Sequence, residues 1–212
     1  MIFADSHSHL DLFENPGEII KNAKKEGVNG FFSCATNLES MKKHLSIFAS
    51  DKSVRIGLGL HPVDCLLKLN ENEIEDALFF LEKNASKCHA IGEIGLDYKY
   101  AKTQKERELQ KEIFVRQASL AVKKKLPLAI HSRLAEPECL EVLESLGAKK
   151  VLLHWFTYSP QNIPRAAENG FFMSCGPVIF SSKKDLQAAL AIPDGLLLLE
   201  TDCPVAFGGK QS

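Results

Sequence analysis

The stretch that decides the fold is Lys125-Leu126-Pro127-Leu128-Ala129-Ile130-His131-Ser132-Arg133, in which an apolar run passes directly into polar residues. The run over 127–130 is short and apolar throughout, which is typical of a parallel strand covered on both faces. Residues 105–124 before it carry an apolar stripe at helical spacing, and residues 137–146 after it form a helix candidate that ends at Gly147. A strand between two such helices predicts a parallel sheet.

The same alternation continues in both directions along the chain. The eight apolar runs are 1–4, 30–34, 54–60, 90–94, 127–130, 151–153, 170–173 and 195–199. The seven helix candidates are 16–25, 39–48, 71–83, 105–124, 137–146, 160–169 and 183–191. Eight strands that alternate with helices predict an α/β fold, a (β/α)8 barrel of the TIM type, whose usual length is about 250 residues. A doubly wound open sheet competes, but no Gly-x-Gly-x-x-Gly follows the first strand, which disfavours a dinucleotide fold.

The end of the chain bears on how the barrel closes. The last apolar run is followed by a short segment to Ser212, with no candidate for an eighth helix. We therefore expect residues 1–212 to form a single barrel domain in which the final helix is missing. The flank of Leu196–Leu199 and the outer face of the first strand should then be more exposed than in a closed barrel.

Composition excludes several classes of protein. The 212 residues include 26 Lys and Arg against 27 Asp and Glu, a net charge of −1, which argues against a broad basic surface that holds nucleic acid by counterion release alone. No apolar run approaches the roughly 20 residues of a membrane span. The N-terminus has neither a basic nor an apolar signal region. Six well-separated cysteines without a Cys-x-x-Cys pair predict reduced thiols in a cytoplasmic protein.

Polar residues gather at one end of the predicted strands. Catalytic groups of such barrels lie at the carboxyl ends of the strands. The residues predicted there are Asp5-Ser6-His7-Ser8-His9, His61, Glu93 to Asp97, His131-Ser132-Arg133, His154 and Glu200-Thr201-Asp202. Five of the seven histidines are included, and we interpret the other two, His44 and His89, as structural.

These residue types favour a metal centre. His7 and His9 are two positions apart on an extended segment, so both face the same side. Glu93 has two oxygens and can bridge two ions, and further ligands are available from His131, His154 and Asp202. Mixed nitrogen and oxygen ligands suit Zn²⁺ and also Mn²⁺ or Mg²⁺. Two divalent ions about 3.5–4 Å apart would clamp the attacking and leaving oxygens of a displacement.

Each of these residues also has an ordinary structural interpretation. The histidine pair could belong to a polar turn, Glu93 to a salt bridge at the rim, and Asp202 to a helix N-cap. The same coincidence at six strand ends makes the structural interpretation of the whole set improbable.

Three further rim residues leave alternatives open. His61 either contacts substrate or caps a strand. Arg133 either binds an anionic phosphate or forms an ion pair with Asp97 or Glu136. Trp155 either stacks on a base or packs in the interior.

The ordered motifs resemble a known family, the TatD-type metal-dependent DNases among the amidohydrolase-like metallohydrolases. They are Asp5-Ser6-His7-Ser8-His9-Leu10, Gly59-Leu60-His61-Pro62, Gly92-Glu93-Ile94-Gly95-Leu96-Asp97-Tyr98, Leu126-Pro127 with His131-Ser132-Arg133, His154-Trp155-Phe156 and Glu200-Thr201-Asp202-Cys203-Pro204. The resemblance implies a (β/α)8 barrel and hydrolysis of DNA phosphodiester bonds, often from a 3′ end. It also implies a site in which His7 and His9 hold the first ion, Glu93 bridges, His131 and His154 hold the second ion, and Asp202 completes the set.

The leading hypothesis is thus a deoxyribonuclease with two divalent ions (Zn, Mn or Mg), in which Asp202 and Glu93 are catalytic and His61 and Arg133 bind substrate. Its partner would be DNA, as single strands or 3′ ends, and the protein would be a cytoplasmic monomer. The alternative is a hydrolase of a small amide, lactone or phosphoester, which the near-neutral charge mildly favours. A third possibility is a barrel without enzymatic activity, against which the complete ligand set counts.

Overall fold

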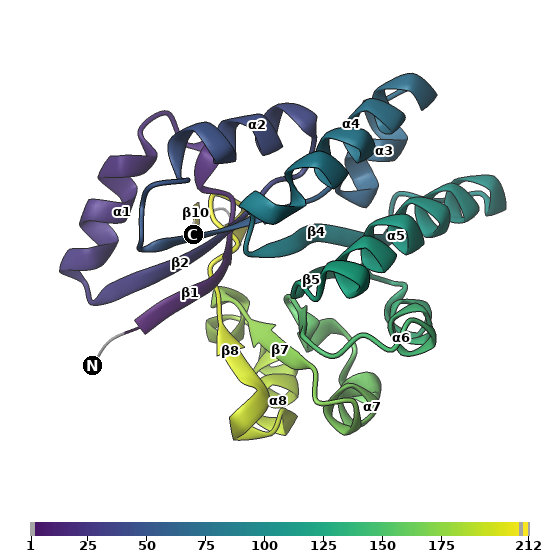
Figure 1. The fold of residues 1–212 in the computed structure, drawn as a ribbon. Helices are drawn as coiled ribbons and strands as arrows, with labels where there is room; N and C mark the ends of the chain where they lie inside the picture. Colours follow the sequence, from purple (N-terminus) through teal and green to yellow (C-terminus); the bar gives the residue numbers. More distant parts are fainter. Residues whose placement is uncertain (1–2, 208–209, 212) are drawn as a thin grey trace.

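A computed structural model describes residues 3–207 and 210–211, and its eight parallel strands form a nearly closed barrel. The strands follow the chain order: β1 (Phe3–Ser8), β2 (Val28–Cys34), β3 (Val54–Leu58), β4 (Ala90–Asp97), β5 (Leu128–Arg133), β6 (Val151–Leu153), β7 (Phe172–Cys175) and β8 (Leu197–Leu199). Figure 1 shows the helices arranged around the outside of these strands. The predicted barrel is confirmed.

The helices join consecutive strands and cover the outer face of the barrel. They are α1 (Pro16–Lys25), α2 (Leu38–Ile47), α3 (Pro62–Leu67), α4 (Glu71–Asn84), α5 (Gln104–Lys124), α6 (Glu136–Ser145), α7 (Ile163–Glu168) and α8 (Lys183–Ala191). α5 shows why these boundaries form. Thr103 and Glu106 make a capping box at its start, and Lys125 ends it in the left-handed conformation. Its buried Ile113 and Phe114 belong to the core between helices and strands.

Several strands extend beyond the apolar runs that predicted them. β1 was expected over 1–4 but runs through Ser8, and β4 and β5 run on to Asp97 and Arg133. The backbone pairing of β4 with β5 continues past the apolar residues, with Asp97 opposite Arg133. Backbone hydrogen bonds do not require apolar side chains, so a strand can continue while its side chains become polar.

Other segments differ in kind. α3 was not predicted; it begins at Pro62, where His61 accepts a hydrogen bond from the Val63 backbone. The helix expected over 160–169 is a 3-10 turn, Pro160–Asn162, followed by α7. After β8 the described residues contain no helix but a two-stranded hairpin of β9 (Ala206–Phe207) and β10 (Lys210–Gln211).

The seam between β1 and β8 is where the barrel is incompletely closed. Within the described residues, β1 pairs only with β2, and β8 only with β7. Leu199 is 52% exposed and Phe3 is 43% exposed, whereas Leu196, Leu197 and Leu198 are half-buried. Beyond the end of β8, however, the Asp202 N–H donates to the carbonyl of His7 at 2.9 Å, and the His9 N–H donates to that of Cys203 at 2.8 Å. The two edges therefore meet at the end of the barrel that carries the polar residues.

Two further predictions concern surfaces and thiols. None of the helices in the described part of the chain combines the length and apolarity needed to cross a membrane. All six cysteines are buried and none forms a disulfide.

Candidate metal centre

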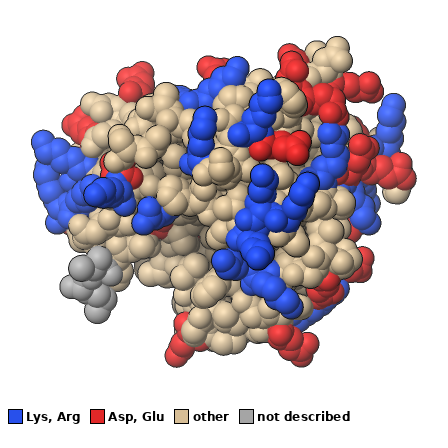
Figure 2. Space-filling model, in the orientation of Figure 1, with Lys and Arg blue, Asp and Glu red and all other residues tan. Residues whose placement is uncertain are grey.

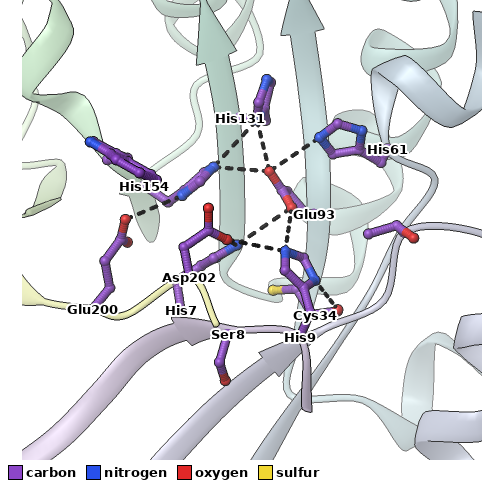
Figure 3. A network of polar contacts seen from close by, with 12 residues as sticks. His7, Ser8, His9, Cys34, His61, Glu93, His131, His154, Glu200 and Asp202 are labelled. Atoms are coloured by element: carbon purple, nitrogen blue, oxygen red, sulfur yellow. Dashed lines mark hydrogen bonds and ion pairs between the residues drawn. The ribbon is translucent and has the colours of Figure 1, made fainter. Parts of the chain in front are cut away.

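The six predicted metal ligands meet around the carboxylate of Glu93, at the carboxyl ends of the strands (Figure 3). Glu93 is 2% exposed. Its Oε2 lies 3.4 Å from His7 Nε2 and 3.3 Å from His9 Nε2. Its Oε1 lies 2.8 Å from His131 Nδ1 and 2.9 Å from His154 Nε2. Each oxygen of this one carboxylate thus faces its own pair of histidines.

The first set is completed by Asp202 and has the spacing of ligands around one ion. Asp202 Oδ1 lies 3.6 Å from His7 Nε2 and 3.3 Å from His9 Nε2. Donor atoms at the usual 2.0–2.2 Å from a tetrahedral ion lie about 3.4 Å apart. Both ring nitrogens of His7 are buried without a hydrogen-bond partner among the described residues, a costly arrangement that an ion at Nε2 would relieve in part. These residues fit a divalent metal.

The ring of His9 is oriented by a backbone carbonyl. Its Nδ1 lies 2.8 Å from the carbonyl oxygen of Cys34, at the end of β2. A carbonyl only accepts, so Nδ1 carries a proton, and Nε2, which faces Glu93 and Asp202, is the atom that would bind a metal once its own proton is released. A carbonyl or carboxylate on the far nitrogen is the usual support of a metal-binding histidine.

The second set has the same support from two buried acids. His131 Nε2 lies 2.9 Å from Asp97 Oδ2, which leaves its Nδ1 free to face Glu93. His154 Nδ1 lies 3.4 Å from Glu200 Oε1, and its Nε2 faces Glu93. Ser174 donates a short hydrogen bond to the other oxygen of Glu200. With no ion bound, the nitrogens that face Glu93 therefore donate to it, and each becomes free to bind a metal when it releases its proton.

Asp97 and Glu200 are the functional residues whose roles the sequence analysis missed. Both were placed at strand ends, but neither was assigned to a histidine. The available signal was their position: buried acids at the rim of a histidine-rich site are the expected second partners of its ligands.

His61 has the opposite arrangement. Its Nδ1 accepts a hydrogen bond from the backbone N–H of Val63 at 3.2 Å. The proton of the neutral ring therefore lies on Nε2, which is 3.4 Å from Glu93 Oε1. His61 is close enough to Glu93 and His131 to belong to a ligand cluster by distance. Its tautomer instead makes it a hydrogen-bond donor that points into the site.

The electrostatics of the cluster are dominated by burial and by the shared acids. Burial opposes the charging of His9, yet its hydrogen bonds to Asp202 and Glu93 raise its pKa to about 10. Burial would raise the pKa of Glu93, but the neighbouring His61, His154 and His7 hold it well below its usual value. Burial lowers the pKa of His61, which keeps this ring neutral. Protons at the ligand histidines consequently compete with a metal ion.

The site opens into a cavity of about 620 Å³ whose walls include Arg133, Lys68, Tyr100 and Trp155. Arg133 forms no ion pair within 4 Å among the described residues. Its charge nevertheless contributes, after the hydrogen bond from His131, to the lowered pKa of Asp97, so it lies near this acid. Lys68 is paired with Asp64 at 2.8 Å. Trp155 is only 9% exposed, in agreement with the packing interpretation.

The remaining two histidines lie away from the cluster. His44 is buried, with Nε2 2.9 Å from Ser33 Oγ and Nδ1 2.9 Å from the carbonyl of Ser40. His89 precedes β4 at the opposite end of the barrel, where its Nδ1 accepts from the Ile56 N–H at 3.0 Å.

A parallel barrel with one carboxylate shared by four histidines, three of them oriented by a second hydrogen bond, at the carboxyl ends of its strands has the architecture of a metal-dependent hydrolase. Comparison with known proteins places it more narrowly, because residues 4–207 match the family described as TatD related DNase. The chain belongs to this family.

Individual relatives agree. The chain is 33% identical to the metal-dependent hydrolase YabD of Bacillus subtilis, an uncharacterized protein, over 100% of this chain and 85% of YabD. It is 30% identical to the human deoxyribonuclease TATDN3, over 98% of this chain and 80% of the relative. The crystal structure of the Escherichia coli TatD homolog YJJV superposes with a TM-score of 0.84 at 28% identity, covering 99% of this chain and 84% of that one.

Proposed function

We propose that this protein is a deoxyribonuclease that hydrolyses phosphodiester bonds of DNA at a centre of two divalent ions. The proposal rests on one observation: the two carboxylate oxygens of Glu93 face different histidines. Oε2 faces His7 and His9, and Oε1 faces His131 and His154. One carboxylate between two ligand sets can hold two ions close together, as two-metal hydrolysis requires. Relatives named as deoxyribonucleases support DNA as the substrate.

Each residue of the site has a distinct proposed role in hydrolysis. His7, His9 and Asp202 would hold one ion, His131 and His154 the other, and Glu93 both. Bound there, Zn²⁺, Mn²⁺ or Mg²⁺ would supply charge for the phosphate and a water acidic enough to attack near neutral pH. Attack of the water oxygen on phosphorus would break the bond from phosphorus to the leaving sugar oxygen. Asp202 would accept the proton of the water, and the leaving oxygen would take up a proton as it departs.

The substrate is held by the two rim residues that are not ligands. His61 donates its Nε2–H to a phosphate oxygen, and Arg133 provides a positive charge and a planar set of donors for the same group. Arg133 and Lys68 both line the cavity, and of these two only Lys68 forms an ion pair in the described part of the chain. Figure 2 shows one face of the molecule, on which Lys and Arg side chains gather near the middle and most Asp and Glu side chains lie toward the edges. The net charge of −1 and the small number of cations that line the cavity suit a short single-stranded or 3′-terminal segment better than a long contact with a duplex. We further propose a monomer, in a reducing compartment such as the cytoplasm, where six unpaired thiols persist.

The test compares metal-depleted and metal-reconstituted protein on labelled single-stranded DNA and on a panel of small amides, lactones and phosphoesters. We expect DNA cleavage that depends on the added ion and is abolished by His131→Ala. Turnover confined to the small-molecule panel would establish the alternative, which the net charge of −1 favours. Analysis of the cleaved ends would give the direction of attack.

A further inference from the structure

Asp5 bonds across the incompletely closed seam of the barrel to the residue beside Asp202. Its Oδ1 accepts from the Thr201 N–H at 3.1 Å, and its Oδ2 accepts from the Thr201 hydroxyl at 2.6 Å. The same Oδ1 accepts from the His7 N–H at 3.2 Å. Thr201 Oγ1 in turn accepts from the Cys203 N–H at 3.2 Å. Asp5 is 8% exposed, so these bonds are protected from water.

The residues on either side of this contact are candidate ligands of one ion. His7 lies in β1 and His9 directly follows it, whereas Asp202 follows β8, and within the described residues no strand pairing joins these two strands. Asp202 also has a left-handed backbone with φ of 54°, which a non-glycine residue adopts only when its surroundings hold it. The distances of 3.3 and 3.6 Å between Asp202 Oδ1 and the two histidines therefore depend on the bonds that cross the seam. These are the backbone bonds from Asp202 to His7 and from His9 to Cys203, together with the side-chain bonds of Asp5.

We propose that Asp5 and Thr201 are positioning residues, which set Asp202 against His7 and His9 and so shape the first metal site. The inference rests on the proposed two-metal function. Neither residue is within the ligand set; they act through the backbone on both sides of Asp202. A supporting bond of this kind typically changes metal affinity 10- to 100-fold.

The experiment titrates the metal-free full-length protein with Co²⁺, followed by visible absorption, and compares Thr201→Val with Thr201→Ser. Valine matches threonine in shape but removes the hydroxyl, which deletes the bond to Asp5 Oδ2 and the one from Cys203. We expect Thr201→Val to bind one of two Co²⁺ ions about 10- to 100-fold more weakly, with an altered absorption band, and Thr201→Ser to bind within about threefold of the wild type.

Thr157→Val is the matched control. Thr157 is buried and donates to Asp185 Oδ1 at 2.8 Å, a bond of the same type that touches none of the proposed ligands. Its loss should lower the unfolding temperature and leave Co²⁺ affinity unchanged. Should Thr201→Val not fold, Asp5→Asn provides the second measurement, because it keeps one acceptor oxygen but loses the acceptor for the hydroxyl.

The outcomes separate the two proposals. Wild-type protein that binds no Co²⁺ would overturn the metal centre and the positioning role together. If wild type, Thr201→Val and Asp5→Asn all bind two ions tightly, the positioning role is overturned and the proposed function still stands. Equal weakening in Thr201→Val and Thr157→Val would also overturn it, since the effect would then follow stability alone.

Discussion

The backbone N–H of Val63 donates to Nδ1 of His61, and this single bond separates His61 from the other four histidines of the site. Where another of these histidines has a partner for the ring nitrogen that points away from Glu93, that partner is a hydrogen-bond acceptor. For His9 it is the Cys34 carbonyl oxygen. His61 is held by a donor, so its inward nitrogen carries a proton. Distance alone would count His61 among the metal ligands, because it lies close to Glu93. Its hydrogen bonding instead makes it a donor to the substrate.

We expect His61→Ala to lower kcat about 100-fold while two ions still bind, because the loss of a donor to a charged oxygen costs about this much. Metal content by elemental analysis and cleavage of single-stranded DNA provide the two measurements. His131→Ala is the comparison, since it should lose metal as well as activity. Loss of an ion from His61→Ala would instead make His61 a ligand.

Metal binding should weaken as the pH falls. The hydrogen bonds to Asp202 and Glu93 raise the pKa of His9 to about 10, so below that pH the ring is protonated until an ion displaces the proton. One proton released per ion makes the apparent Kd at least tenfold larger for each unit of decrease in pH. Competition with a chelator at pH 6, 7 and 8 measures this slope. A Kd independent of pH over this range would contradict the proton competition.

Arg133→Gln should raise KM for DNA and reduce kcat/KM about 10- to 100-fold, the usual effect of one charged hydrogen bond of 1.5–3 kcal/mol. Arg133→Lys keeps the charge but loses the planar donor set, so it should recover only part of the loss. Steady-state kinetics at two salt concentrations test this. Unchanged kinetics in Arg133→Gln would remove Arg133 from the substrate contacts.

Gly95→Ala should destabilise the barrel by about 3 kcal/mol or more. Gly95 has φ of 141°, and a Cβ there would lie 1.9 Å from the carbonyl oxygen of His131, a backbone atom that cannot move without breaking the pairing of β4 and β5. Gly195→Ala is the control, because nothing lies within 4 Å of its Cβ position. Urea unfolding of the two variants should differ clearly; equal midpoints would refute the steric argument.

Local pattern was enough to predict the barrel. Short apolar runs such as 151–153 alternate with amphipathic segments such as 183–191, and that alternation calls for a parallel sheet covered by helices. Local pattern was less informative where strands become polar: β1 continues to Ser8 and β5 to Arg133 because the backbone ladder, rather than the side chains, maintains them.

The sequence by itself determined that His, Asp and Glu residues would share one end of the barrel, because the carboxyl ends of parallel strands lie together. Only the tertiary structure decided which ring nitrogen each histidine presents, since Asp97, Glu200 and the Cys34 carbonyl come from other strands. It also decided how the site closes: Asp5 and Thr201 are 196 positions apart, and their hydrogen bond exists only because the barrel brings its first and last strands together. Residue type sets which atoms are able to bind a metal, whereas protonation and distance are set by neighbours that the chain reaches only by folding.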